Sequence, residues 1–134
     1  MSSVAKPVLA PARPGAGITF LAAWLVPGAG HFLQGQPRKA VILFVILTTM
    51  FAIGLGFAGR LFPFQMAEPL VFLAAVAEWA IGVPRVIASI SGAGRGDVVA
   101  ATYEYGNTFL ITAGLLNVLA IFDAHDLATG RKRA

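Results

Sequence analysis

The chain has 134 residues, of which 57% are hydrophobic and 12% are charged, with a formal net charge of +4. Soluble domains are usually about one quarter charged, so this composition excludes an ordinary soluble domain. The absence of cysteine excludes disulfides and thiolate chemistry. The basic residues flank apolar segments and form no basic face with interleaved aromatic residues, so we expect no nucleic acid partner.

Long apolar segments lie between the charged residues. No Asp, Glu, Lys or Arg occurs between Lys39 and Arg60, and this gap of 20 residues is the length that a helix needs to cross a bilayer core. The sequence therefore predicts an all-α integral membrane protein with about four transmembrane helices in a single domain, residues 16–130. The spans are expected at residues 17–33, 40–59, 69–90 and 106–122.

The segment before the first span, residues 1–15, is rich in Pro, Ala and Ser, and we expect it to be a disordered tail. A cleaved signal peptide is the alternative interpretation. Lys6 and Arg13 give it a basic start, an apolar core follows, and residues 28–30 are small enough for cleavage.

The first span is short and contains Pro27. Proline removes a backbone donor and clashes with the carbonyl four residues earlier, and Gly28 and Gly30 permit a bend or a close approach of another helix. We therefore expect a short helix kinked at Pro27, and a re-entrant half-helix fits the same residues. His31 is expected near the membrane boundary, where an imidazole needs no special role.

The second span ends in Gly54-Leu-Gly-Phe-Ala-Gly59, which matches the letters of the dinucleotide fingerprint G-x-G-x-x-G. That motif requires a strand before it and a soluble helix after it, whereas here the glycines end a membrane span. Gly54 is therefore expected to pack closely against another helix.

Glu78 is the most informative residue of the third span. It lies nine residues beyond Pro69, about 13.5 Å into the helix, and a charge near mid-bilayer costs about 2.5–3.5 kcal/mol on insertion scales. Glu78 is therefore expected to face other helices and to have a partner. The candidates are Asn117, Thr48, Thr49 and Arg85. Two interpretations stay open: a buried polar lock that holds the helices together, or a proton or cation site.

Arg85 follows Pro84 near the end of the third span. We expect it to extend toward the lipid headgroups, and an anion site near the kink is the alternative. On the fourth span, polar and small residues recur together and indicate a helix-packing face, although a substrate pathway is also conceivable. These residues are Gly106, Asn107, Thr112, Ala113, Gly114 and Asn117.

The end of the fourth span carries three potential metal ligands, Asp123, His125 and Asp126, within four residues. Metal binding would need a fourth group and suitable geometry, so a solvated helix end is expected, followed by a basic tail at residues 131–134. No nucleophile–base pair, pair of catalytic carboxylates or phosphate loop is visible. We therefore expect no enzyme activity, no catalytic residue, no cofactor and no metal.

The Lys and Arg residues do not decide the orientation of the chain, and no internal repeat is visible in the sequence. With four spans and cytosolic termini, six basic residues lie inside and four outside. If the first segment is re-entrant, the count is again six to four, so the positive-inside rule does not choose between the two arrangements.

Residues 27–35, Pro-Gly-Ala-Gly-His-Phe-Leu-Gln-Gly, carry a resemblance to known membrane proteins. The two-transmembrane-helix domain family has a similar series of glycine, glycine, histidine, aromatic and glycine before a basic residue and an apolar span. This chain lacks the tyrosine that usually follows the aromatic residue in that family, and it has two further predicted spans.

The chain is more similar to an uncharacterised bacterial family of small multi-span membrane proteins, and the resemblance covers most of residues 17–132. That family shares the P-G-x-G-H-F start and a related ending. The matching residues are Gly106-Asn107-Thr108-Phe109, Gly114-Leu115-Leu116-Asn117, Asp123 and Gly130-Arg131-Lys132. The resemblance implies a four-span helical membrane protein and implies no activity.

The leading functional hypothesis is a non-enzymatic accessory, assembly or scaffold component of the inner (plasma) membrane. Its expected partners are the lipid bilayer and another membrane protein or a second copy of itself, because small-residue faces are many and ionisable groups are few. The alternative is a small transporter or channel subunit that uses Glu78 as an intramembrane proton or ion site.

Overall fold

The computed structural model describes residues 14–130, so most of the tail expected at residues 1–15 and all of the basic tail expected at residues 131–134 lie outside the described residues. The described part is helical and contains no strand beyond one isolated bridge between Arg60 and Arg95. The helices are α1 (Ala16–Leu25), α2 (Ala29–Leu33), α3 (Pro37–Gly56), α4 (Pro69–Trp79), α5 (Val83–Ile90) and α6 (Tyr103–Thr129).

Two helices are long and apolar enough to cross a membrane: α3 with 20 residues and α6 with 27 residues. A third span is present only if α4 and α5, which are bent by 108° at their break, are taken as one. At 10 residues, α1 is half the length that a bilayer core requires. The protein is therefore all-helical with two or three candidate spans, and the expectation of about four spans is not confirmed.

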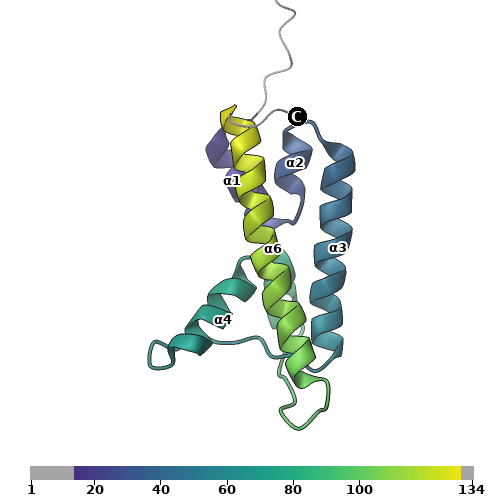
Figure 1. The fold of residues 1–134 in the computed structure, drawn as a ribbon, viewed down its shortest axis with the longest axis vertical. Coiled ribbons are helices and arrows are strands. Elements are labelled where there is room, and N and C mark those ends of the chain that lie inside the picture. Colours follow the sequence, from purple (N-terminus) through teal and green to yellow (C-terminus); the bar gives the residue numbers. More distant parts are fainter. Residues whose placement is uncertain (1–13, 131–134) are drawn as a thin grey trace, which may run out of the picture.

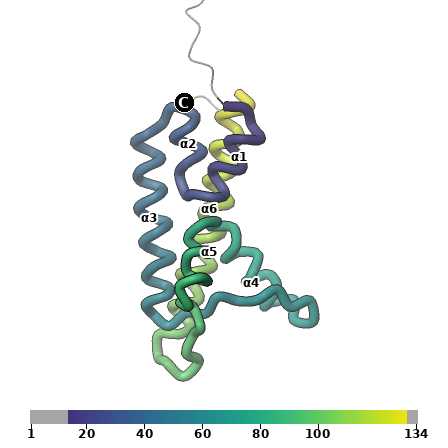
Figure 2. Tube along the Cα trace, turned by 180° about the vertical axis from the view of Figure 1, so that it is seen from behind, coloured from purple at the N-terminus to yellow at the C-terminus, as the bar shows by residue number. Residues whose placement is uncertain are grey.

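The expected first span forms two helices rather than one helix kinked at Pro27. The backbone of Gly28 is left-handed, with φ +86°, and a Cβ there would overlap the carbonyl oxygen of Ala40 on α3. Because a proline and a left-handed glycine follow one another, the chain reverses direction instead of bending. Figures 1 and 2 together show α2 turning back toward the end of the molecule at which α1 begins, which agrees with the re-entrant alternative.

The expected third span is also divided, at residues 80–82. Gly82 has φ +84°, a conformation that L side chains rarely adopt, and Pro84 lies in the first turn of α5. A helix that reaches such a glycine ends there, and the proline starts a new helix in another direction. We call α1 with α2 the first hairpin, and α4 with α5 the second hairpin.

The order of elements occurs twice, as two short helices followed by a long one (Figures 1 and 2). The first hairpin lies beside the end of the molecule that holds Pro14 and Gly130, which we call the terminal end. The second hairpin lies beside the opposite end, which we call the distal end. The long helices α3 and α6 run through both halves, so the two hairpins enter from opposite ends (Figures 1 and 2), an arrangement that the sequence did not reveal.

The core lies along one face of α6. Leu110 and Ala113 of α6 are fully buried in a cluster with Leu47 and Phe51 of α3 and Ile81 of the second break. Buried residues recur every three or four positions along α6, which is the spacing of one helical face. They are Tyr103, Gly106, Asn107, Leu110, Ala113, Gly114, Asn117, Ala120, Ile121, Ala124 and Leu127.

Candidate functional site: a buried polar network where the two hairpins meet

The breaks of the two hairpins touch each other. The indole Nε1 of Trp24, in the last turn of α1, donates a hydrogen bond of 2.9 Å to the carbonyl oxygen of Trp79, the last residue of α4. A Cβ on Gly82 would overlap the carbonyl oxygen of Trp24, so only glycine permits this approach. The break of each hairpin therefore packs directly against the break of the other.

Asn117 of α6 joins both hairpins to the long helix. Its side chain is fully buried, and its Nδ2 donates to the carbonyl oxygens of Ala23 at 3.2 Å and of Ala80 at 2.8 Å. These carbonyls belong to the ends of α1 and α4, where backbone acceptors lack partners within the helix. One amide group thus satisfies the ends of two broken helices that approach from opposite sides.

Glu78 and Arg85 of the second hairpin hold the backbone of Phe62 between them. Oε1 of Glu78 accepts a hydrogen bond of 2.7 Å from the Phe62 amide, and Nη2 of Arg85 donates to the Phe62 carbonyl at 3.3 Å. Arg85 also donates to the hydroxyl of Ser89, and its guanidinium lies 4.7 Å from the ring centroid of Trp79. The linker before α4 is therefore fixed to the inner side of the second hairpin.

The bend between α4 and α5 explains how Arg85 reaches the vicinity of Glu78. On one continuous helix the two residues would be about 10.5 Å apart along the axis. The bend of 108° turns α5 back, so that both side chains bind the backbone of Phe62 without a direct ion pair between them. Within the described residues no hydrogen bond or ion pair joins Glu78 directly to any of its four candidate partners, and Arg85 is linked to it only through the backbone of Phe62.

A second polar cluster lies at the terminal end. His31 of α2 is 1% exposed, and its Nε2 lies 2.6 Å from Oδ2 of Asp123 on α6. Nζ of Lys39, in the first turn of α3, donates to the same oxygen at 2.9 Å. Three helices therefore meet at one carboxylate, and His31, expected at the membrane boundary without a role, is buried in an ion-pair cluster.

The first hairpin is closed by a further buried pair and by close packing. Nε2 of Gln34 donates to the hydroxyl of Thr19 at 2.8 Å, and both side chains are buried. A Cβ on Gly30 would lie 2.6 Å from the Cβ of Ala23 and 2.8 Å from that of Ala124. The series from Pro27 to Gly35 is therefore a folding motif in which glycines permit contact and polar residues bridge helices.

The glycines expected at packing positions on the long helices are also at close contacts. A Cβ on Gly54 would lie 2.7 Å from a side-chain carbon of Leu110. A Cβ on Gly114 would overlap the carbonyl oxygen of Ala77, so α4 rests directly on the backbone of α6.

The potential ligands near the end of α6 do not converge on one point. Asp123 binds His31 and Lys39, whereas the ring of His125 meets the ring of Phe20 edge-on, with centroids 6.1 Å apart. Within residues 14–130 no group of three His, Asp or Glu side chains could hold a metal ion.

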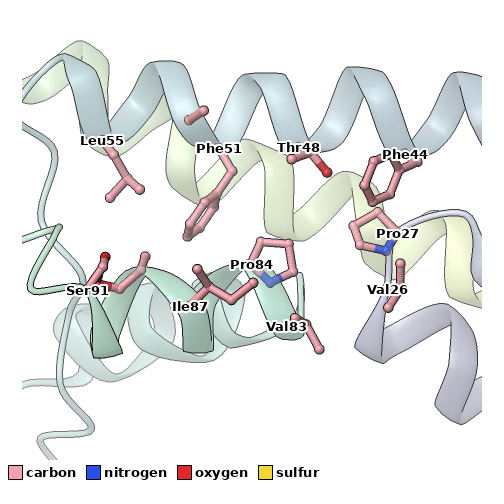
Figure 3. Close-up of a pocket in the computed structure, with 12 residues that line it drawn as sticks. Val26, Pro27, Phe44, Thr48, Phe51, Leu55, Val83, Pro84, Ile87 and Ser91 are labelled. Carbon is pink, nitrogen blue, oxygen red and sulfur yellow. Dashed lines mark hydrogen bonds between the residues drawn. The ribbon is translucent and has the colours of Figure 1, made fainter.

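Five grooves lined mainly by apolar side chains lie between the helices, and the largest of these has a volume of about 470 Å³. Figure 3 shows Phe51 and Leu55 of α3 facing Pro84 and Ile87 of α5 across it. Glu78 lines none of the five grooves.

Sequence reasoning missed several residues of these networks. Thr19, Gln34 and Lys39 gave no signal on their own, and Phe62 takes part only through its backbone. One signal was available: His31 and Gln34 are three residues apart and thus on one face of a helix, next to glycines, in a chain with few polar residues.

The fold and the network define an all-helical protein with helices able to span a membrane. A family model described as a family of unknown function (DUF6677) matches residues 18–133, and the chain belongs to this family. This agrees with the expected uncharacterised family, while the relation to the two-transmembrane-helix domain family stays a prediction. Comparisons with curated proteins and with solved structures found no match.

Proposed function

We propose that this protein is a non-enzymatic component of the plasma membrane that assembles with other membrane helices as an accessory or scaffold subunit. The observation that carries the proposal is the position of α4. This helix leaves α5 at 108°, and apolar grooves of about 360 and 330 Å³ flank it, against α6 and against α1. In this proposal a transmembrane helix of a partner, or of a second copy, packs into these grooves beside α4.

The polar residues support an architectural role rather than a chemical one. The carboxylate of Glu78 and the amide of Asn117 both bind backbone groups at helix ends or in a linker. In a bilayer such groups must be satisfied within the protein. If Glu78 and Asn117 act as polar locks, each of these hydrogen bonds satisfies a backbone group that water cannot reach.

The assembly proposal is tested by photo-crosslinking from the grooves beside α4. A photoreactive amino acid at Leu73, which lines one groove and is 61% exposed, should yield a protein–protein adduct in native membranes. The matched control is Ile42 of α3, which is 50% exposed and lines none of the five grooves. Equal adduct yields at both positions, or lipid adducts alone, would overturn the proposal.

A small transporter or channel subunit is the second candidate, and one observation favours it. Two broken helices that enter from opposite ends and meet in the middle are typical of transporter folds with inverted repeats. In this version, Glu78 would bind a proton or cation near the meeting point.

Substitution of Glu78 by Gln separates the two candidates. The amide oxygen of Gln still accepts from the Phe62 amide, so the lock interpretation predicts intact assembly and a loss of about 1 kcal/mol of stability. The measurement compares wild type and Glu78→Gln in proteoliposomes that contain a pH-sensitive dye, with imposed proton, Na⁺ and K⁺ gradients. An ion flux that is present in the wild type and abolished in the folded variant would establish the second candidate instead.

A further inference from the structure

A groove between the two long helices at the terminal end has a polar mouth and an apolar floor. Its volume is about 390 Å³, and it lies apart from the grooves beside α4. One face of α3 and one face of α6 line it, because the residues on each helix are spaced three or four apart. They are Leu43, Ile46, Leu47, Leu116, Leu119 and Ala120.

The mouth of this groove is formed by the cluster of His31, Lys39 and Asp123. The carboxylate of Asp123, held by buried His31, binds Nζ of Lys39 at 2.9 Å and so fixes the ammonium above the groove. An ammonium group has three donors, and the Lys39 side chain is 44% exposed. One of these donors is used by the Asp123 carboxylate, so the groove presents the two remaining donors of a positioned ammonium at its polar end.

We propose that this groove binds a phospholipid, with one acyl chain between α3 and α6 and the phosphate on the ammonium of Lys39. The groove runs along two helices that are long enough to span a bilayer, so its apolar floor faces the acyl region. Lys39 lies in the first turn of α3, at the level where a span meets the headgroups, and the positive end of the helix dipole adds to its charge. Basic pockets between membrane helices are typical headgroup sites.

A phospholipid matches both parts of the site. Inorganic phosphate would use Lys39 and leave the apolar groove unfilled, whereas a partner helix would fill the groove and gain nothing from the fixed ammonium. The site rests on the arrangement of α2, α3 and α6 and does not depend on the assembly role proposed above.

The test uses the full-length protein in nanodiscs and native mass spectrometry in mild detergent. Phosphatidylglycerol and phosphatidylethanolamine are titrated separately, with diacylglycerol as the lipid that has no phosphate. We expect both phospholipids to be retained on the wild type and diacylglycerol to be lost. Lys39→Gln should bind phospholipid about fivefold more weakly, the effect of one basic residue at a membrane surface.

Matched variants keep the test decisive if one substitution perturbs folding. Arg38→Gln removes an exposed neighbouring charge that does not line the groove, and it should retain lipid as the wild type does. Leu116→Trp fills this groove and should reduce retention, whereas Leu73→Trp fills a groove beside α4 and should not. Folding is checked by circular dichroism and gel filtration.

Three results would overturn the proposal. Equal phospholipid retention in Lys39→Gln and Arg38→Gln would show that the Lys39 ammonium does not contribute to lipid binding. Retention of diacylglycerol at the wild-type level of phospholipid would show that the headgroup is not recognised. Displacement of bound lipid by millimolar inorganic phosphate would identify the site as one for the free ion.

Discussion

The two hairpins each consist of two short helices joined at a break, but different contacts hold these helices in place. In the first hairpin α1 and α2 lie against each other, with Gly30 in contact with Ala23 and with Gln34 bonded to Thr19. In the second hairpin α4 leaves α5 at 108°, and the backbone of the linker residue Phe62 is bound by Glu78 of α4 and Arg85 of α5. The first hairpin is closed by side chains that touch, and the second is held open by a segment bound through its backbone.

The difference follows from the residues at the two breaks. Pro27 and Gly28 form a tight reversal, and small residues then allow the following helix to approach the preceding one. In the second hairpin Glu78 and Arg85 flank the break, and both are buried ionisable side chains that require partners. The backbone of the linker supplies those partners, so the helices stay apart. The second hairpin consequently has an apolar groove on each side of α4.

The opposed entry of the two hairpins can be tested by labelling single cysteines. The effect expected is the largest of those considered, because labelling should be all or none. The chain contains no cysteine, so single-cysteine variants at positions 36 and 95 can be labelled without background. Two full spans and two re-entrant hairpins place position 36 at the terminal end and position 95 at the distal end. A membrane-impermeant maleimide should therefore label only one of the two variants from the outside of intact cells.

Labelling of positions 36 and 95 from the same side would contradict the opposed entry of the two hairpins. It would instead indicate four full spans, which put both positions on the side opposite the termini. Thr129→Cys, an exposed position of α6 at the terminal end, is the control and should behave as position 36 does. We expect the terminal end to face the cytoplasm. Arg38 and Lys39 lie there, and the adjoining sequence adds Lys6, Arg13 and Arg131-Lys132-Arg133, an arrangement typical of the positive-inside rule.

The meeting point of the hairpins is tested by Gly82→Ala, with the second largest expected effect. The alanine has to keep the positive φ of Gly82, and its methyl group overlaps the Trp24 carbonyl. Stability should therefore fall by about 3 kcal/mol. Gly92→Ala is the matched control, because Gly92 has a similar φ of +81° and nothing within 4 Å of the added Cβ. Reversible unfolding in mixed micelles measures both, and equal losses would mean that the two breaks do not press on each other.

Features of the fold that depend on residues close together in the sequence could be predicted, whereas features that depend on contacts between distant residues could not. The start of a helix at Pro69 and the packing face of α6 follow from proline and from residue spacing, and the structure has both. The division of two expected spans does not follow, because a proline and a glycine in an apolar segment fit both a kink and a reversal. What decides between them is contact with distant residues, such as Gly28 with Ala40 and Gly82 with Trp24.

Three side chains of the network, Glu78, Arg85 and Asn117, were singled out from the sequence, but the groups that they bind were not. An apolar neighbourhood and a mid-span position single out Glu78 without any structure. Its partner is a backbone amide in a linker, and no side-chain pattern in a sequence indicates a backbone partner. The cluster of His31, Lys39 and Asp123 joins residues up to 92 positions apart, so sequence distance concealed it.

Asn117→Leu should remove the link that ties both hairpins to α6. Two hydrogen bonds are lost and the carbonyls of Ala23 and Ala80 stay buried, so we expect a loss of about 2 kcal/mol in a membrane-mimetic environment. Thr108→Ala, at an exposed site of the same helix, is the control and should change stability by less than about 0.5 kcal/mol. If Asn117→Leu is as stable as the control, then helix packing alone holds the hairpins in place.

The smallest expected effect concerns the closure of the first hairpin, through Thr19→Val. Valine keeps the branched shape and removes the hydroxyl that accepts from Gln34, while the Gln34 amide keeps its bond of 3.1 Å to the Pro14 carbonyl. One buried hydrogen bond is lost and its donor group retains a partner, so the cost should be about 1 kcal/mol, measured by the same unfolding assay. Because Gly30 still packs on Ala23, the hairpin should stay closed, and cysteines placed at Ile18 and Phe32 should keep their wild-type accessibility. If accessibility rises sharply in Thr19→Val, the polar pair rather than the small-residue contact closes the first hairpin, and the two hairpins would then share one principle of construction.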